Sequence, residues 1–256
     1  MAEAASRAQA AADEAKAAAE AFVSIAVDWT KVPCPPFRKA FLEGAFSVAD
    51  VAAAAAKRTE LNISVESDAG GSGAIPAPLN SFSDLAVLPA WMHQSFTESR
   101  WDVPMPVQAQ ALPILLAGRN LIGIAQTGSG KTGAFLIPAI VHAHAQRPLR
   151  RADSGPVVLV VAPTRELAVQ ISDEADKLLR HSWKSYEHRG GLRSVCFYGG
   201  GRKFQQLQQF TFDGSHIVVA TPGRLIDFCK EGKVSLQRVT YFCLDEADRM
   251  LDMGFS

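Results

Sequence analysis

The stretch that decides the fold runs from Leu121 to Thr132 and reads L-I-G-I-A-Q-T-G-S-G-K-T. Its first five residues, 121–125, form a short apolar run that is typical of a buried β-strand. The glycines that follow allow a tight loop whose backbone N–H groups face inward, and a helical pattern over 131–145 comes next. A strand, a glycine-rich loop and a helix in this order predict a site for the phosphates of a nucleotide.

Within this loop, residue types match the chemistry of phosphate binding. Lys131 brings a positive charge to the β- and γ-phosphates, and the Thr132 hydroxyl is a suitable ligand for Mg²⁺. The strict pattern GxxxxGK[ST] has glycine where this chain has Ala125. A glycine-rich turn without a function is the alternative, and the strand–loop–helix context argues against it. The predicted nucleotide-binding residues of the loop are Gln126, Thr127, Gly128, Ser129, Gly130, Lys131 and Thr132.

From residue 81 onward, short apolar runs alternate with helical patterns. Strands are predicted at 121–125, 157–162, 194–198, 217–220 and 241–244, and helices near 131–145, 164–181, 202–210 and 223–230. Near-continuous apolar strands that alternate with helices indicate an α/β fold, in which helices cover both faces of a parallel sheet. In such sheets the functional residues gather at the carboxyl ends of the strands.

The N-terminal part of the chain has a different texture. Residues 2–21 are alanine-rich and predict an isolated helix, a second helix is predicted through 51–58, and 61–65 alternates like a short strand. Glycine and proline are frequent over 68–78, which indicates a linker. The predicted organisation is an N-terminal extension over 1–66, a linker over 67–80 and an α/β domain over 81–256.

Charge and cysteine content limit the classes of partner. The chain has 26 basic and 26 acidic residues, so a nucleic acid would be met by a local patch rather than by the field of the whole protein. No apolar run is long enough to span a membrane, and we expect an intracellular protein without a membrane partner. The six histidines show no ligand spacing, so no metal beyond Mg²⁺ is expected. Buried free thiols are favoured over a metal site or disulfides for the four cysteines, Cys34, Cys196, Cys229 and Cys243.

A second candidate site, made of acidic side chains, follows the last predicted strand. Residues 242–248 read F-C-L-D-E-A-D, so Asp245 comes directly after the apolar run 241–244. A nucleotide on the glycine-rich loop needs Mg²⁺, and Mg²⁺ needs a carboxylate from a neighbouring strand end. Asp245 is the candidate for that ligand, and Glu246 is placed to orient or deprotonate an attacking water. Solvated charges at a strand end are the alternative.

These motifs together resemble the DEAD-box RNA helicases. The resemblance rests on A-Q-T-G-S-G-K-T at 125–132 and D-E-A-D at 245–248, supported by P-T-R-E-L-A at 163–168, Gly199-Gly200, T-P-G-R at 221–224 and R-M-L-D-M-G-F at 249–255. Ala125 is the family's own variant of the loop. The resemblance implies a RecA-like ATP-binding domain, ATP and Mg²⁺ as cofactors, and catalytic roles for Lys131, Asp245 and Glu246.

Residues 101–108, which read W-D-V-P-M-P-V-Q, resemble the family's adenine-reading Q motif. The resemblance implies that Gln108 hydrogen-bonds the adenine edge, that Trp101 stacks on the base, and that Phe82 is the upstream aromatic residue of the motif. The chain departs from the family at Arg100, at Trp101 and at Met105, where the family usually has glycine, phenylalanine or tyrosine, and threonine. A core aromatic is the alternative role for Trp101.

The resemblance also implies where RNA binds. Thr164 and Thr221 follow predicted strands and open predicted helices, so hydroxyl and backbone N–H groups there can bind phosphate oxygens. Arg165 has an alternative role within the domain. Contacts of this kind read the RNA backbone, which predicts little sequence specificity. The predicted RNA-binding residues are Pro163, Thr164, Arg165, Gly199, Gly200, Thr221, Pro222, Gly223 and Arg224.

Members of this family have a second RecA-like domain, which supplies arginines to the γ-phosphate and half of the RNA groove. Neither that domain nor the S-A-T motif expected some thirty residues after D-E-A-D is in the sequence, so we expect a fragment that is poorly stable and inactive in unwinding. A catalytically incompetent fragment that binds nucleotide or partners is the rival hypothesis, and a DNA-directed helicase is a weaker one. A similarity to one nuclear subgroup predicts ribonucleoprotein partners and favours the nucleus, including the nucleolus, over the cytoplasm.

Overall fold

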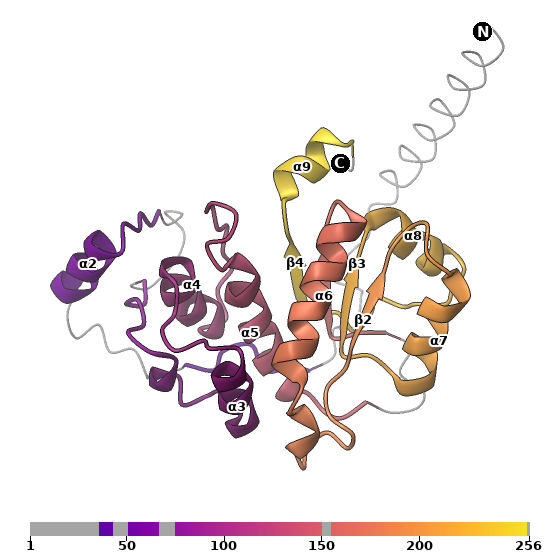
Figure 1. The fold of residues 1–256 in the computed structure, drawn as a ribbon, viewed down its shortest axis with the longest axis horizontal. Coiled ribbons are helices and arrows are strands. Elements are labelled where there is room, and N and C mark those ends of the chain that lie inside the picture. Colours follow the sequence, from indigo (N-terminus) through magenta and orange to yellow (C-terminus); the bar gives the residue numbers. More distant parts are fainter. Residues whose placement is uncertain (1–35, 43–50, 67–74, 150–154, 255–256) are drawn as a thin grey trace, which may run out of the picture. The chain divides into compact units, whose positions relative to one another are not determined.

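A computed structural model of the chain describes residues 36–42, 51–66, 75–149 and 155–254 (Figure 1). The predicted helix over 2–21 lies outside these ranges. The chain divides into two compact units, 1–35 and 36–256, and all of the described residues belong to the second. The compact unit therefore begins well before residue 81, where the sequence suggested that the α/β domain starts.

Four parallel strands form the sheet at the centre of this unit. They are β1 (Val158–Val161), β2 (Ser194–Phe197), β3 (Ile217–Ala220) and β4 (Tyr241–Leu244), in the spatial order β2-β3-β1-β4. Each of these strands matches a predicted apolar run to within one residue at either end. The predicted α/β class with a parallel sheet is confirmed.

Helices cover both faces of the sheet, as Figure 1 shows. On one face the core contains Val158 and Val160 together with α3 (Ala90–Glu98), α4 (Pro106–Leu116), α5 (Lys131–His144) and α6 (Arg165–Leu179). On the other face Leu159 and Val161 pack with α7 (Lys203–Asp213), α8 (Pro222–Lys230) and α9 (Ala247–Asp252). Successive strand residues point to opposite faces, so continuous apolar strands are what a sheet covered twice requires.

Two predicted strands are wrong. Residues 121–125 form no strand, and Ile122 and Ile124 are 92% and 96% exposed. A strand needs a partner for its backbone groups, and no strand among the described residues pairs with this segment, since β4 pairs with β1 alone. Residues 61–65 instead end α2 (Val51–Glu60): the N–H groups of Leu61 and Ile63 bond carbonyls of that helix, and the chain turns at Asn62, whose φ is 54°.

The segments before residue 81 are bonded to the helical layer. The Phe41 N–H donates to the Leu116 carbonyl at 2.7 Å. From α2, Arg58 Nε donates to Gln110 Oε1 at 2.7 Å, and Arg58 Nη2 donates to the Pro76 carbonyl at 2.8 Å. The α2 helix therefore lies beside α4 at the periphery (Figure 1), and residues on both sides of the predicted linker join the compact unit.

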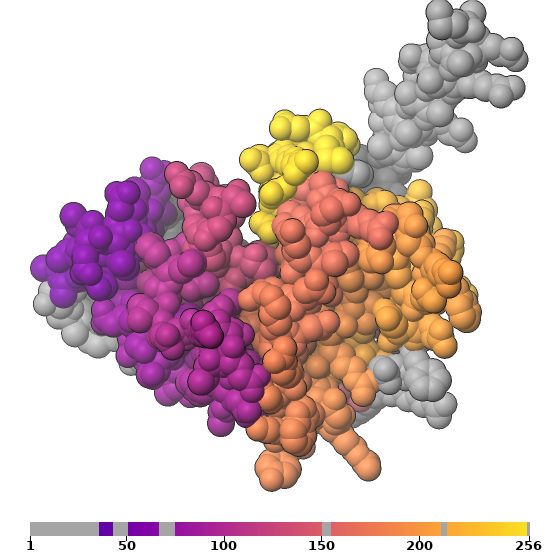
Figure 2. All heavy atoms as spheres, viewed as in Figure 1, coloured from indigo at the N-terminus to yellow at the C-terminus, as the bar shows by residue number. Residues whose placement is uncertain are grey.

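In the space-filling view, α9 projects from the body of the domain above α6 (Figure 2). In the part of the chain that the structure describes, no helix is long and apolar enough to cross a membrane. The described cysteines are free thiols, and burial raises the pKa of Cys196 and Cys243 to about 12. Both thiols are therefore protonated and unreactive at neutral pH.

Candidate functional site

The carboxyl ends of the four strands lie at one edge of the sheet and in register. Val161 of β1 is level with Ala220 of β3 and Leu244 of β4, and Ala220 is level with Phe197 of β2. Backbone bonds continue past these ends, including one of 3.0 Å from the Asp245 N–H to the Val161 carbonyl. Four loops therefore leave the sheet at one level, which is where a parallel sheet places its functional residues.

The glycine-rich loop precedes α5 and is open to solvent. Gly128 and Gly130 have φ values of 80° and 88°, a backbone conformation that only glycine adopts without strain. Gly130 is the N-cap residue of α5 and provides no side-chain cap, so the first N–H groups of that helix face the loop. Gln126 and Thr127 are exposed, whereas Ser129, Lys131 and Thr132 are half-buried.

The ammonium group of Lys131 bends back onto this loop. It donates hydrogen bonds to the carbonyl oxygens of Ala125 and, at 2.9 Å, of Gln126. The Ser129 hydroxyl is buried without a hydrogen-bond partner among the described residues. A phosphate group offers acceptors to both side chains, so the loop holds donors that an anion would satisfy.

Asp245 and Glu246 follow β4 directly. Burial raises the pKa of the Asp245 carboxyl group, with a smaller contribution from the negative charge of Glu246, while the charge of Lys131 acts in the opposite direction. Lys131 and Asp245 therefore interact electrostatically, which links the glycine-rich loop to the acidic site. A carboxylate that is costly to ionise in this way is suited to a cation, and the assignment of Asp245 and the Thr132 hydroxyl as Mg²⁺ ligands stays a prediction.

Glu246 has a backbone conformation that is rare for residues other than glycine. Its φ of 51° and ψ of 48° lie in the left-handed region, where a side chain costs about 1–2 kcal/mol. Its N–H donates to Asp245 Oδ1 at 3.1 Å, and its carboxylate pairs with Arg249 at 3.1 Å. Strained backbone is common at functional sites, and here it turns two successive carboxylates to different partners.

The Q-motif residues contact the glycine-rich loop from the side of α4. Gln108 is 4% exposed and uses both ends of its amide: Oε1 accepts from the Met105 N–H at 3.0 Å, and Nε2 donates to the Gly130 carbonyl at 3.1 Å. Phe82 is also 4% exposed and lies behind Trp101, with its ring parallel to the indole within 25°. Phe82 thus supports Trp101, and direct contact between a base and these residues stays a prediction.

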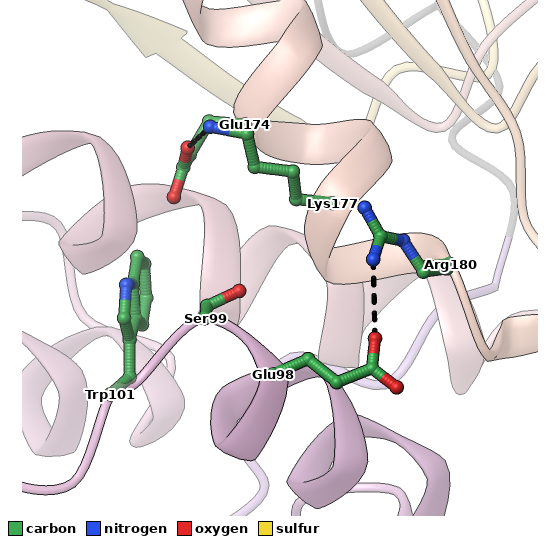
Figure 3. A pocket seen from close by; sticks show the side chains of 6 residues that line it. All are labelled: Glu98, Ser99, Trp101, Glu174, Lys177 and Arg180. Carbon is green, nitrogen blue, oxygen red and sulfur yellow. Dashed lines mark hydrogen bonds and ion pairs between the residues drawn. The ribbon is translucent and has the colours of Figure 1, made fainter.

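Trp101 is half-buried and borders a cavity of about 350 Å³ (Figure 3). The charged side chains around this cavity pair with one another, Glu98 with Arg180 at 3.2 Å and Glu174 with Lys177 at 2.9 Å. Their charges are balanced, so the cavity has no excess positive charge for phosphates. Of the residues that line this cavity, Trp101 is the one that is also predicted to stack on the base.

The predicted RNA-binding residues follow β1, β2 and β3, which are neighbours in the sheet. Thr164 is the N-cap residue of α6 and accepts a hydrogen bond from the Leu167 N–H at 3.3 Å, with Pro163 buried before it. Gly199 and Gly200 are exposed after β2. Thr221 is the N-cap residue of α8 and makes no side-chain cap bond, and the exposed Gly223 lies in the first turn after Pro222.

The two arginines of this set are held within the domain. The Arg165 guanidinium lies over the Tyr198 ring, 4.6 Å from its centroid. Arg224 Nη1 donates to Gln206 Oε1 at 3.1 Å, and Gln206 also bonds both backbone groups of Tyr198. Tyr198 and Gln206 were not predicted as site residues. The position of Tyr198 directly before the Gly199-Gly200 pair was the one signal in the sequence.

Comparison with known proteins identifies the family. A family profile described as "DEAD/DEAH box helicase" matches residues 105–256, more than half of the chain. The chain belongs to this family. Membership of this family explains why the glycine-rich loop, the two carboxylates after β4 and the loops that follow β1, β2 and β3 occur together in one chain.

The similar proteins are RNA helicases. The chain is 49% identical over 181 residues to a putative DEAD-box RNA helicase HEL64 of Trypanosoma brucei brucei and to the ATP-dependent RNA helicase DBP2 of Saccharomyces cerevisiae. These matches cover 70% and 71% of this chain but only 30% and 31% of the relatives. The crystal structure of the yeast DEAD-box splicing factor Prp28 matches with a TM-score of 0.71 and 30% identity, over 82% of this chain and 46% of that one. The chain therefore spans about a third of the length of the curated relatives it matches.

Proposed function

We propose that this chain is the ATP-binding domain of an ATP-dependent RNA helicase. The observation that carries the proposal is the combination of a glycine-rich loop at the start of α5, where the Ser129 hydroxyl has no partner among the described residues, with two carboxylates directly after β4. Burial raises the pKa of Asp245 and the charge of Lys131 opposes that rise, which supports one site for both groups. The family membership and the names of the relatives support ATP as the nucleotide and RNA as the nucleic acid.

Each side chain of the site has a role in hydrolysis under this proposal. The Lys131 ammonium leaves the loop carbonyls and binds the terminal phosphates, helped by the N–H groups at the start of α5. Asp245 and Thr132 would hold Mg²⁺, which would supply positive charge beside the phosphates when bound. The Glu246 carboxylate orients the attacking water and accepts its proton.

RNA crosses the loops that follow β1, β3 and β2 in this proposal. Thr164 and Thr221 are N-cap residues, so each places a hydroxyl beside free helix N–H groups that suit phosphate oxygens. Arg165 and Arg224 add positive charge, while their contacts with Tyr198 and Gln206 keep each side chain in place. Because these groups recognise phosphate and sugar, little sequence specificity follows.

The remaining partners come from the wider resemblance. A second RecA-like domain would contribute arginines to the γ-phosphate and complete the RNA groove, and ribonucleoprotein complexes in the nucleus are the expected setting. Both belong to the proposal for the whole protein, because the chain spans only part of its relatives.

The test is ATP turnover by the 256-residue chain with and without single-stranded RNA, beside binding of a fluorescent ATP analogue. Binding with little turnover is expected, since arginine groups that stabilise transferring phosphate contribute factors of about 10³–10⁵. In a chain that carries a second domain, Glu246→Gln should retain binding and lose about 10²–10⁴-fold in turnover. Absence of nucleotide binding by the unaltered chain refutes the proposal.

A catalytically incompetent nucleotide-binding or partner-binding fragment is the second candidate. The exposed and unpaired segment 121–125 favours it, because the glycine-rich loop then has no strand to fix its start. RNA-stimulated turnover that Glu246→Gln abolishes in the chain as it stands would exclude this candidate. Nucleotide binding without any turnover, in a chain that includes a second domain, would favour it.

A further inference from the structure

Gly133 lies in the first turn of α5, where a glycine has no evident backbone role. Its φ is outside the left-handed region, in contrast to Gly128 and Gly130. Glycine within a helix costs about 1 kcal/mol relative to alanine. The residue is also buried, so a side chain would remove apolar surface from water there. Something other than backbone conformation must account for glycine at this position.

The space beside Gly133 is filled by two Q-motif side chains. A Cβ atom at position 133 would lie 2.6 Å from Cη2 and 2.8 Å from Cζ3 of Trp101, and 2.7 Å from Nε2 of Gln108. These separations are well inside the ordinary contact distance of about 3.5–4.0 Å between carbon atoms. The missing Cβ is therefore what allows the indole and the amide to lie against the first turn of α5.

Neighbouring groups hold both side chains in place. The Trp101 ring stacks on Phe96, with centroids 5.8 Å apart and planes 17° apart, and on Phe82 at 6.2 Å. Both phenylalanines are buried, and the backbone N–H of Trp101 donates to the Phe96 carbonyl at 2.9 Å, which fixes the main chain from which the ring projects. The Gln108 amide is bonded at both ends, as described above. A methyl group at position 133 would have to displace a side chain that its neighbours hold in place.

We propose that Gly133 is a positioning residue for nucleotide binding, matched in size to Trp101. Because position 133 has no side chain, the Trp101 indole and the Gln108 amide can lie against the start of α5. The segment that would read the base is thereby held against the loop that would bind the phosphates. The inference rests on the proposed nucleotide-binding function and adds a residue that positions the base-reading segment. Gly133 itself contacts no substrate; it acts through Trp101 and Gln108.

The size match gives a rescue experiment. Phenylalanine lacks Cη2 and Cζ3 of the indole, which are the Trp101 atoms that a Cβ at position 133 would meet. Gly133→Ala is expected to weaken binding of a fluorescent ATP analogue about tenfold, a size typical of coupling between residues in contact. In the double variant with Trp101→Phe, the second change should restore part of the lost affinity, because the clash with the indole is removed while the contact of the added Cβ with Gln108 Nε2 remains. A non-additive double-mutant cycle is the expected signature.

The matched control is Gly123→Ala, because a Cβ atom at position 123 meets nothing within 4 Å. Thermal melts provide a second readout: Gly133→Ala should lower the melting temperature despite the better helix propensity of alanine, and Trp101→Phe should reverse part of that effect. Unchanged affinity in Gly133→Ala, with binding by the unaltered chain intact, overturns this inference alone. Absence of nucleotide binding by the unaltered chain refutes the proposed function, and with it the role of Gly133 in nucleotide binding.

Discussion

Mild acid should destabilise this domain through His216. This side chain is 5% exposed, and its Nδ1 accepts a hydrogen bond from the Arg193 N–H at 3.3 Å. Burial lowers the pKa of His216 to about 3, and the charges of His188, Arg238 and Arg193 act in the same direction. The unfolded chain takes up a proton as the pH falls through about 6.5, whereas the folded chain does not until about pH 3. The contribution of buried, neutral His216 to the free energy of unfolding is thus complete above pH 6.5 and is lost progressively below it.

The size of the effect follows from the two pKa values. Each pH unit inside this window lowers the free energy of unfolding by about 1.4 kcal/mol, so a change from pH 7 to pH 5 removes about 2 kcal/mol through His216. His142, whose pKa burial lowers to about 4, should add a loss of similar size. The matched variant is His216→Asn, since its Oδ1 can accept the Arg193 N–H and asparagine does not titrate.

Urea unfolding followed by tryptophan fluorescence at pH 7, 6 and 5 tests this reasoning. His216→Asn should lose about 2 kcal/mol less than the unaltered chain between pH 7 and pH 5. His93→Asn is the control, because His93 is exposed on α3. Equal losses in the unaltered chain and in His216→Asn would show that His216 takes up its proton in the folded state, and the reasoning would fail.

Three further predictions concern single contacts. Thr164→Ala should lower stability by about 1 kcal/mol, measured by thermal melting, because the Leu167 N–H loses its cap acceptor. Arg58→Ala should cost about 1–2 kcal/mol in the same assay, since it removes hydrogen bonds that tie α2 to Gln110 and to the segment before residue 81. Asp245→Asn should raise the melting temperature at pH 7, because burial raises the pKa of this carboxyl group and its ionised form therefore destabilises the fold; the gain should shrink as the pH falls through the raised pKa of the folded state and should be absent below the unfolded pKa of about 3.9.

The sheet could be predicted because its central strands, β1 and β3, are buried on both faces. A strand of that kind has to be apolar at every position, and the runs that became β1 and β3 stand out against their polar surroundings. The run that became β4 is also apolar, although Phe242 and Leu244 are 57% and 48% exposed. The run 121–125 has the same character but forms no strand here. Hydrophobicity reports that a segment suits burial, whereas strand formation also needs a neighbouring backbone, and no sequence window contains that information.

The site could be predicted in part for a related reason. A residue that directly follows a strand, such as Asp245 or Thr221, must lie at the edge of the sheet, so chain position alone places it. The contacts that orient such residues come from distant segments. Tyr198 under Arg165 and Trp101 against Gly133 depend on how loops pack, and neither pair has a characteristic spacing in the sequence.

The exposed segment 121–125 changes what positions the glycine-rich loop. With Ile122 and Ile124 open to solvent, the sheet contributes nothing to the start of the loop in this structure. The glycine-rich loop is instead positioned by contacts at its C-terminal end. There α5 packs closely on α4, and Gln108 Nε2 donates to the Gly130 carbonyl. Lys131 is the first residue of α5, which is also held to β4 by the bond from the Tyr241 hydroxyl to the Phe135 carbonyl at 3.0 Å. The contacts that Gly133 permits therefore bear on phosphate binding as well as on the base, and a Gly133→Ala change should weaken tripolyphosphate binding along with that of ATP.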